Sequence, residues 1–399
     1  MPIRTRWTRL RSTLARDRLL VNTSAVHLTN DACFSLLYPL LPFISSDLGL
    51  SFTEVGLLKA TFSGSSSVLQ IPTASIGARF GEYLVLLAGN LWVGIGLALM
   101  GLASGYIALL LLATLAGIGG NAQHPLGAAL ISRSSEGPRL ATAMGTLNFA
   151  GDLGKLIGPF IAGIVAVKFG WQAALLAVGL PTALLSIGLL VSRRNGESGR
   201  ETRQTGSSTR SSILLRNARF RFVLLAGGLD NATRGAALTF LPFILTDKGL
   251  DAAEVSVLYG VIFAAGAAGK FGCGWMSDRW GLLAVIVTTE LVTAGALLAM
   301  LGASVWMVVP LAIAFGFALN GTSSALNVAV ARFVPSGQRA GGYGIYFTVA
   351  LISSAAAPLA YGVLGDLSGL TTVFVVMAVM TAVVIPVILP IRGALGSIA

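Results

Sequence analysis

Charge is scarce in this chain. Only 11% of its 399 residues are Asp, Glu, Lys or Arg, whereas 55% are hydrophobic, and the mean hydropathy is +0.82. A soluble protein of this length needs more charge to cover its surface. The composition therefore excludes an ordinary soluble domain and predicts many membrane spans.

Groups that carry soluble-enzyme chemistry are also scarce. The two cysteines, Cys33 and Cys273, lie in apolar runs, and there are only two histidines. The sequence contains no phosphate-cradling P-loop and no His/Cys cluster, so we expect no cofactor, no metal and no enzymatic activity. ATP hydrolysis within the chain is excluded in the same way, which leaves an ion gradient as the simplest source of energy.

A net charge of +11 would suit a nucleic-acid partner, but the long apolar runs do not. The basic N-terminus, residues 1–18, precedes an apolar segment that contains His27, Asn30 and Asp31 and has no small-residue cleavage site. We interpret this segment as a retained first span rather than a signal peptide. The predicted partners are a lipid bilayer, protons and a small-molecule substrate, without nucleic acid, and we expect a monomer.

The chain repeats itself at an offset of 200 residues. Residues 41–55 read LPFISSDLGLSFTEV and residues 241–255 read LPFILTDKGLDAAEV, with nine of fifteen positions identical. This period is far too long for a solenoid repeat. In so apolar a chain, it indicates a duplicated bundle, as found in secondary transporters.

Apolar runs of about 20 residues, enough to cross a bilayer as helices, occur twelve times. We predict spans at 19–46, 53–77, 82–103, 106–131, 139–167, 171–192, 217–246, 252–276, 281–303, 306–333, 339–365 and 369–391. The fold class is thus an all-α membrane protein of twelve transmembrane helices in two pseudo-symmetric six-helix bundles. The bundles cover 19–192 and 217–391, with a polar connector at 193–216 and a tail at 392–399.

Most of the 27 Lys and Arg residues lie in the termini, the connector and one set of loops. By the positive-inside rule, both termini and the connector are expected on the cytoplasmic side of the cell (inner) membrane.

The loop after the eighth span reads Gly274-Trp-Met-Ser-Asp278-Arg279-Trp-Gly281. This resembles the major facilitator superfamily, whose 2–3 and 8–9 loops carry G-x-x-x-D-R-x-G. The resemblance implies a latch in which glycine allows a tight turn and the charged pair holds neighbouring helix ends. The first-half copy departs from the pattern, with Ala78 at the Asp position and Glu82-Tyr83 in place of a basic pair.

The fifth span resembles the antiporter motif of proton-linked drug-efflux members of that superfamily. It contains Gly145, Gly154, Gly158-Pro159 and Gly163, with Ala162 where the motif often has glycine. These residues allow a bend and close helix contact. Packing explains them equally well, and efflux is implied only by the resemblance.

Three further segments narrow the resemblance to the fosmidomycin-resistance group of drug exporters. They are His27-Leu-Thr-Asn30-Asp31, Tyr38-Pro39-Leu-Leu-Pro42, and Gly117-Ile-Gly119 leading to His124-Pro125. The arginine that many proton-coupled members carry in the fourth span is missing here. The equivalent stretch is Ala113-Thr-Leu-Ala116-Gly117.

A charge at the bilayer centre costs about 2.5–3.5 kcal/mol, so each intramembrane charge needs a partner, water or a function. Asp31 is the leading candidate for a proton-carrying carboxylate, and the alternative is a fixed structural hydrogen bond. Asp152 and Lys155, and likewise Asp230 and Arg234, share helix faces and either neutralise each other or serve protons and substrate. We assign proton coupling to Asp31 and Asp152.

Polar contacts to substrate are predicted on both halves. The candidate cavity residues are Asn30, His124, Lys155, Asp230, Asn231, Arg234, Asn320 and Asn327. His124 relays protons or donates to a carbonyl freed by Pro125. Two further charges are given structural roles: Glu290 as a partner for the Asp278-Arg279 loop, and Lys59 near the outer face, snorkelling or paired with Glu54.

The sequence thus favours proton-coupled antiport that exports a small drug-like or metabolite substrate, anionic ones included, by alternating access. The first alternative is uptake of an organic anion or metabolite by symport or facilitated diffusion. The second is a membrane receptor or scaffold that transports nothing.

Overall fold

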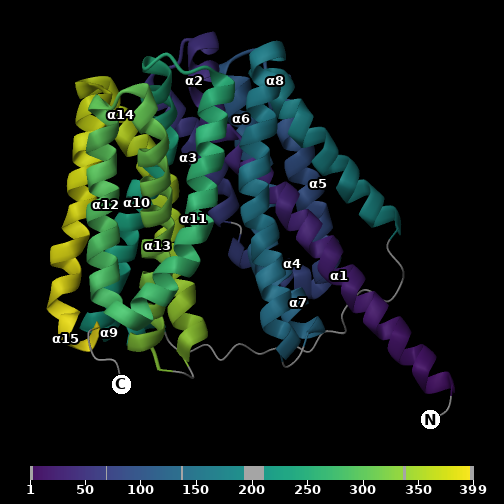
Figure 1. Cartoon of the computed structure of the whole chain (residues 1–399). Helices are drawn as coiled ribbons and strands as arrows, with labels where there is room; N and C mark the ends of the chain where they lie inside the picture. The colour runs from purple at the N-terminus through teal and green to yellow at the C-terminus, as the bar shows by residue number, and fades with distance from the viewer. Residues whose placement is uncertain (1–2, 69, 136–137, 193–210, 336–337, 396–399) are drawn as a thin grey trace. The chain divides into compact units, whose positions relative to one another are not determined.

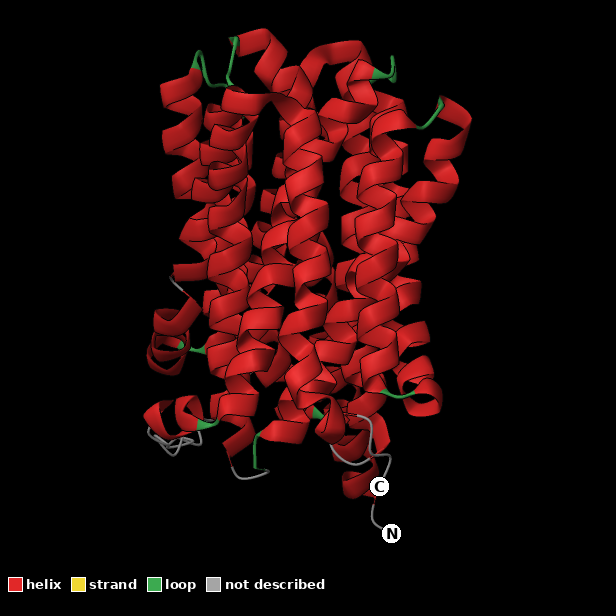
Figure 2. Cartoon of the chain, turned by 90° about the vertical axis from the view of Figure 1, so that its left-hand side faces the viewer, coloured by secondary structure: helices red, strands yellow, loops and turns green. Residues whose placement is uncertain are grey.

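The computed structural model describes residues 3–68, 70–135, 138–192, 211–335 and 338–395, and these contain helices and no strands (Figures 1 and 2). The helices are α1 (Ile3–Ser35), α2 (Leu37–Leu48), α3 (Phe52–Val68), α4 (Gln70–Phe80), α5 (Glu82–Met100), α6 (Tyr106–Gly119), α7 (Gln123–Ser134), α8 (Pro138–Ser192), α9 (Ser211–Arg216), α10 (Ala218–Asp247), α11 (Ala252–Trp280), α12 (Leu282–Gly302), α13 (Val305–Phe333), α14 (Arg339–Ile388) and α15 (Arg392–Leu395).

Helices cover all twelve predicted spans. Among the described residues, six stretches are long and apolar enough to cross a membrane: Glu82–Met100, Thr142–Ser192, Ala252–Trp280, Leu282–Gly302, Val305–Phe333 and Gly341–Leu395. The second and the last each enclose a non-helical glycine, Gly170 or Gly369, and so contain two predicted spans. The first predicted span is divided after Ser35, because the ring of Pro39 clashes with the carbonyl four residues earlier in a continuous helix.

The chain forms two compact units whose boundaries differ from the sequence repeat. Unit 1 is Met1–Leu37 with Val68–Gln204, and unit 2 is Tyr38–Ser67 with Thr205–Ala399. Residues 38–67 belong to the first repeat but pack with the second. The assignment of 19–192 and 217–391 as the functional bundles stays a prediction.

The two halves share backbone conformations as well as sequence. All six positive-φ residues in the described part of the chain are glycines, and they form three pairs: Gly49 and Gly249, Gly81 and Gly281, Gly170 and Gly369. Glycine adopts this conformation without the steric cost that a Cβ imposes. Gly81 and Gly281 thus provide the tight turns that the loop motif predicted.

Residues in the turn between the first two spans of each repeat cap the helix that follows. Asp251 and Glu254 form a capping box at the start of α11, and Ser51 and Glu54 exchange the same two hydrogen bonds at the start of α3. In unit 2, Asp366 also reaches α3 and accepts hydrogen bonds from the backbone N–H groups of Phe52 (2.8 Å) and Thr53 (2.9 Å). The N-terminus of α3 is therefore held by its own residues and by a carboxylate 314 residues away in sequence.

Replacing Asp366, which lies in the turn between two predicted spans, should weaken this cap in a pH-dependent way. Partial burial raises the pKa of Asp366, but the hydrogen bonds from Thr53, Phe52 and Ser51 outweigh it and hold the pKa below its usual value. The stabilisation is therefore complete at neutral pH and is lost as the pH falls through that lowered pKa.

We expect Asp366→Asn to lower the apparent stability at pH 7 by about 0.3–1 kcal/mol, less at high salt. The difference in melting temperature between the wild type and Asp366→Asn should disappear in acid. Asp247→Asn, the same charge change at an exposed position of unit 2, should cause no such loss. A difference that stayed constant with pH would contradict the assigned cap.

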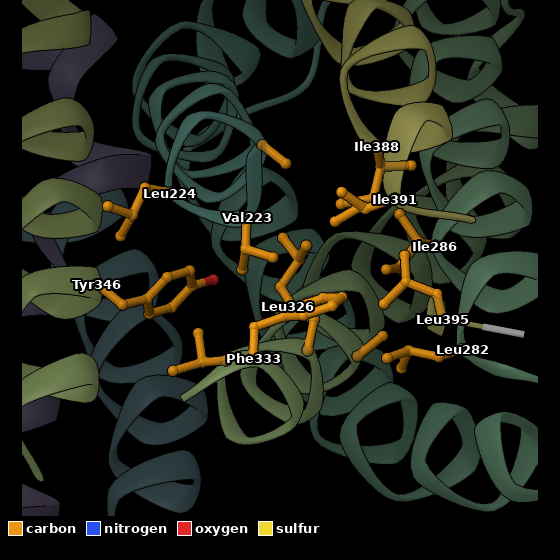
Figure 3. Packing of buried hydrophobic residues seen from close by; sticks show 14 of the residues in the cluster. Val223, Leu224, Leu282, Ile286, Leu326, Phe333, Tyr346, Ile388, Ile391 and Leu395 are labelled. Carbon is orange, nitrogen blue, oxygen red and sulfur yellow. The ribbon is translucent and has the colours of Figure 1, made fainter. Parts of the chain in front are cut away.

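Unit 2 has a large apolar core. Figure 3 shows Val223, Leu326, Ile286, Ile388 and other side chains of α10, α12, α13 and α14 pointing toward one another. Leu214 of α9 is 5% exposed and belongs to this core. The last six residues of the predicted connector thus form a helix that places Leu214 in the core, whereas residues 193–210 lie outside the described chain.

Candidate functional site

Unit 1 gathers four ionisable side chains from α1 and α8. Lys155 Nζ lies 3.2 Å from Asp31 Oδ2 and 3.3 Å from Asp152 Oδ1, so one ammonium is shared by two carboxylates. His27 Nε2 lies 3.5 Å from the same Asp31 oxygen. The sequence predicted the Asp152–Lys155 pair from its spacing; the contact between Lys155 and Asp31 could not be read from spacing.

The glycines of α8 explain how these groups meet. A Cβ added at Gly154 would come within 3.0 Å of the Leu28 backbone, and one at Gly158 within 3.0 Å of the Ala32 backbone. A Cβ at Gly151 would instead come within 3.0 Å of side-chain atoms of His27 and Asp31. Because no side chain separates the two backbones, α1 lies close enough for Asp31 to reach Lys155.

The other members of the span-5 motif are placed differently. Gly145 is exposed and a Cβ there would meet nothing within 4 Å, whereas Gly163 is buried. Pro159 lies inside α8. Packing against α1 is therefore a property of Gly154 and Gly158, and the efflux meaning of the motif stays a prediction.

Unit 2 holds a second charged cluster around Arg234. Its guanidinium donates to Asn320 Oδ1 at 2.7 Å, to the Ser323 hydroxyl and to the Leu319 carbonyl, and it lies 3.7 Å from Asp230 Oδ2. Asp230 is only 3% exposed. This network ties α10 to α13 through the predicted residues Asp230, Arg234 and Asn320.

The remaining residues that we predicted as polar contacts to substrate differ in their burial and hydrogen bonding. The Asn231 amide donates to the Gly227 carbonyl (2.8 Å) and to Asp230. Asn30 is buried. Asn327 Oδ1 is buried with no hydrogen-bond partner among the described residues. His124 lies in the first turn of α7, and its side chain is outside the described part of the structure.

The expected partner of Glu290 was wrong. Glu290 is 1% exposed and lies within electrostatic reach of Asp230 and Arg234, not against the Asp278-Arg279 loop. Its Oε1 has no hydrogen-bond partner in the described chain. This placement could not be predicted, because residues 230 and 290 lie on different helices and only the fold sets the rotation of one helix relative to the other.

The loop-latch residues make few contacts in this structure. The Arg279 guanidinium lies 5.3 Å from the Trp275 ring centroid, and Asp278 makes no hydrogen bond or ion pair within the described residues. Gly274 opens the motif inside α11, and Gly281 ends that helix. In the first-half copy, Glu82 forms an ion pair with Arg133 at the end of α7, a contact that sequence reasoning missed.

Lys59 departs most from expectation. It neither snorkels nor pairs with Glu54: it is 3% exposed, and its Nζ lies 3.9 Å from the Tyr38 ring centroid and 5.5 Å from that of Phe62. Glu54 instead closes the capping box of its own helix. A buried ion costs several kcal/mol, and a desolvated cation–π contact returns about 2 kcal/mol. Lys59 is therefore incompletely compensated within the described chain.

Known proteins resemble this chain over nearly its whole length. The fosmidomycin resistance protein of Escherichia coli (strain K12) is 25% identical over 363 residues, 89% of this chain and 88% of that protein. The 4-hydroxybenzoate transporter PcaK of Pseudomonas aeruginosa is 26% identical over 345 residues, 75% of each chain.

The fold has solved counterparts. A bacterial homologue of the human lysosomal transporter Spinster, in an inward-facing and unoccupied conformation, superposes with a TM-score of 0.83 at 15% identity, covering 96% of this chain and 99% of that one. The sequence also matches the profile of the Major Facilitator Superfamily over residues 23–281 and 223–395. The chain therefore belongs to the major facilitator superfamily and is a multi-pass membrane transporter, not an enzyme.

Proposed function

We propose that this transporter is a proton-coupled antiporter that exports a small drug-like or metabolite substrate by alternating access. The observation that carries the proposal is the position of Lys155 between Asp31 and Asp152, within 3.3 Å of both. One ammonium can compensate only one of the two carboxylates. The other carboxylate is the place for one proton or for one donor group of a substrate.

Competition at this cluster would couple the two fluxes. A substrate amine or hydroxyl that binds Asp31 or Asp152 excludes a proton, and a proton excludes the substrate group. Each species would then leave on one side of the membrane and be replaced by the other on return. In unit 2, Asn231, Asn327 and the Arg234 network stay predicted polar contacts for a substrate.

The same geometry supports a second candidate, uptake of an organic anion by symport. The Lys155 side chain is 35% exposed and could receive an anion once a proton neutralises Asp31 or Asp152. Here proton and substrate assist each other rather than compete. The relative named for 4-hydroxybenzoate, a carboxylate, favours keeping this candidate.

The relatives of this chain are named as a fosmidomycin resistance protein and as a 4-hydroxybenzoate transporter. We place the protein in the inner membrane with both termini cytoplasmic. The concentration of Lys and Arg in the termini and the connector supports this orientation.

The sign of proton linkage separates the two candidates. Ligand affinity should weaken as the pH falls for an antiporter and strengthen for an anion symporter, because linkage is reciprocal. We would measure this with a ligand thermal-shift screen at two pH values, followed by transport in proteoliposomes with an imposed pH gradient. Affinity that does not change with pH would remove proton coupling from both candidates.

Asp31→Asn should abolish the dependence of transport on the pH gradient while leaving counterflow of labelled against unlabelled substrate measurable. The amide keeps the shape of the carboxyl group but cannot carry the proton. Asp17→Asn, the same change at an exposed position of α1, should transport like the wild type. If Asp31→Asn keeps the full gradient dependence, Asp31 is not the proton carrier.

A further inference from the structure

Lys59 differs from Lys155 and Arg234, two cations inside described helices that oxygen atoms bind. Lys155 has two carboxylates, and Arg234 has a carboxylate, a carbonyl and two side-chain oxygens. Lys59 contacts only ring faces: within the described residues no carboxylate, carbonyl or hydroxyl oxygen binds its ammonium. Lys59 is thus a buried amine for which the described part of the chain supplies no anion.

The rings around Lys59 form a fixed aromatic wall in unit 2. Tyr38 stacks on Tyr259 at a centroid distance of 6.1 Å and lies 6.5 Å from Phe263. The Tyr259 hydroxyl donates to the Leu238 carbonyl, which fixes that ring on α10. Tyr38 and Phe263 remain partly exposed, whereas Phe62 and Tyr259 are fully buried. The exposed rings therefore offer a planar apolar surface beside the ammonium.

The helix that carries Lys59 is equally fixed. A Cβ added at Gly56, three residues earlier, would come within 3.0 Å of the Pro358 backbone, so α3 lies directly against α14 at this level. The helix that carries Lys59 and the rings beside its ammonium are thus both anchored. The Lys59 amine is held in place for a partner that comes from outside the chain.

We propose that Lys59 and the partly exposed rings of Tyr38 and Phe263 form a binding site for an aromatic organic anion. The ammonium would pair with a carboxylate or phosphonate, and the partly exposed rings would contact the planar remainder of the ligand. The proposal rests on the proposed transport of small molecules and names the chemical class of substrate. It does not depend on proton coupling or on the direction of transport.

The test compares matched ligands on the purified full-length protein in neutral detergent. The probes are benzoate with benzamide, 4-hydroxybenzoate with 4-hydroxybenzamide, and phenylphosphonate. We expect at least one anion to raise the apparent melting temperature while its amide does not, and Lys59→Gln to weaken its binding by about tenfold or more. Lys168→Gln removes the same charge from an exposed position and should leave binding unchanged.

Further variants keep the test decisive. Tyr38→Leu removes the ring face beside the ammonium and should bind more weakly than the wild type. Lys59→Met replaces Lys59→Gln if the latter does not yield monodisperse protein. The proposal is overturned if no anion stabilises the wild type, or if the stabilisation is the same in the Lys59 variants.

The other source of an anion is a lipid headgroup. A separate experiment tests whether an anionic lipid binds at Lys59. Phosphatidylglycerol is added to the detergent-solubilised protein in place of the soluble probes. Lys59-dependent stabilisation by this lipid alone would overturn the assignment to a substrate. Because the assay uses no membrane and no pH gradient, failure of proton coupling in proteoliposomes would leave its result intact.

Discussion

Gly154→Ala is expected to be among the most damaging single-methyl additions in this chain. The new Cβ would lie within 3.0 Å of the carbonyl group and Cα of Leu28, which are backbone atoms and cannot swing aside as a side chain can. Overpacking of this kind typically costs about 1–3 kcal/mol and occasionally more. We place Gly154→Ala at the upper end, at about 3 kcal/mol, because α1 must move away from α8.

The functional effect should exceed the loss of stability. Moving α1 outward separates Asp31 from Lys155, whose contact of 3.2 Å depends on the same close approach. The loss of stability is measured by the apparent melting temperature and the yield of monodisperse protein. The functional effect is measured by transport per folded protein.

Gly145→Ala is the matched control within the same motif. A Cβ at Gly145 meets nothing within 4 Å, so alanine there should be neutral or stabilise α8 by about 0.5–1 kcal/mol. If Gly154→Ala is as stable and active as Gly145→Ala, then close backbone contact is not what the motif provides.

Arg234→Gln should be the most damaging change in unit 2. It removes the cation beside Asp230, which is 3% exposed, and also removes the donors to Asn320, Ser323 and the Leu319 carbonyl. Breaking a buried ion pair by removing one partner costs about 3–5 kcal/mol, because the other charge stays buried without compensation. Glu290 nearby adds a second carboxyl group to the same low-dielectric region.

A double-mutant cycle tests the origin of that cost. If the uncompensated Asp230 charge dominates, Asp230→Asn should restore much of the stability that Arg234→Gln loses, and the two changes will be far from additive. Strict additivity would instead assign the loss to the hydrogen bonds between α10 and α13. Apparent melting temperatures of the four proteins at one pH decide between these outcomes.

Periodicity and local chemistry were sufficient to predict the helices and several of their ends. Apolar runs located the helices, which lie in all twelve predicted spans, and the repeat located the turns at Gly81 and Gly281 where φ is positive. The pairs Asp152–Lys155 and Asp230–Arg234 followed from helical spacing, since residues three or four apart share a face.

Contacts between distant helices were beyond the sequence. The approach of Asp31 to Lys155 depends on which face of α1 meets the glycines of α8, and the apolar pattern does not fix the rotation of a helix that is apolar on most sides. Glu290 was misplaced for the same reason. Lys59 was misassigned because Glu54, its nearest acid in sequence, is engaged by the backbone at Ser51.

The packing of residues 38–67 with the second half has a consequence for biosynthesis. Phe52 and Thr53 leave the ribosome early, but Asp366, their partner, follows 314 residues later. At about 5–20 residues per second, the interval is on the order of 15–60 s. During that time α3 has neither the Asp366 carboxylate at its N-terminus nor the α14 backbone that Gly56 contacts. Unit 2 can close only when the last hairpin has been made, so a chain truncated before α14 leaves an early segment without its partner.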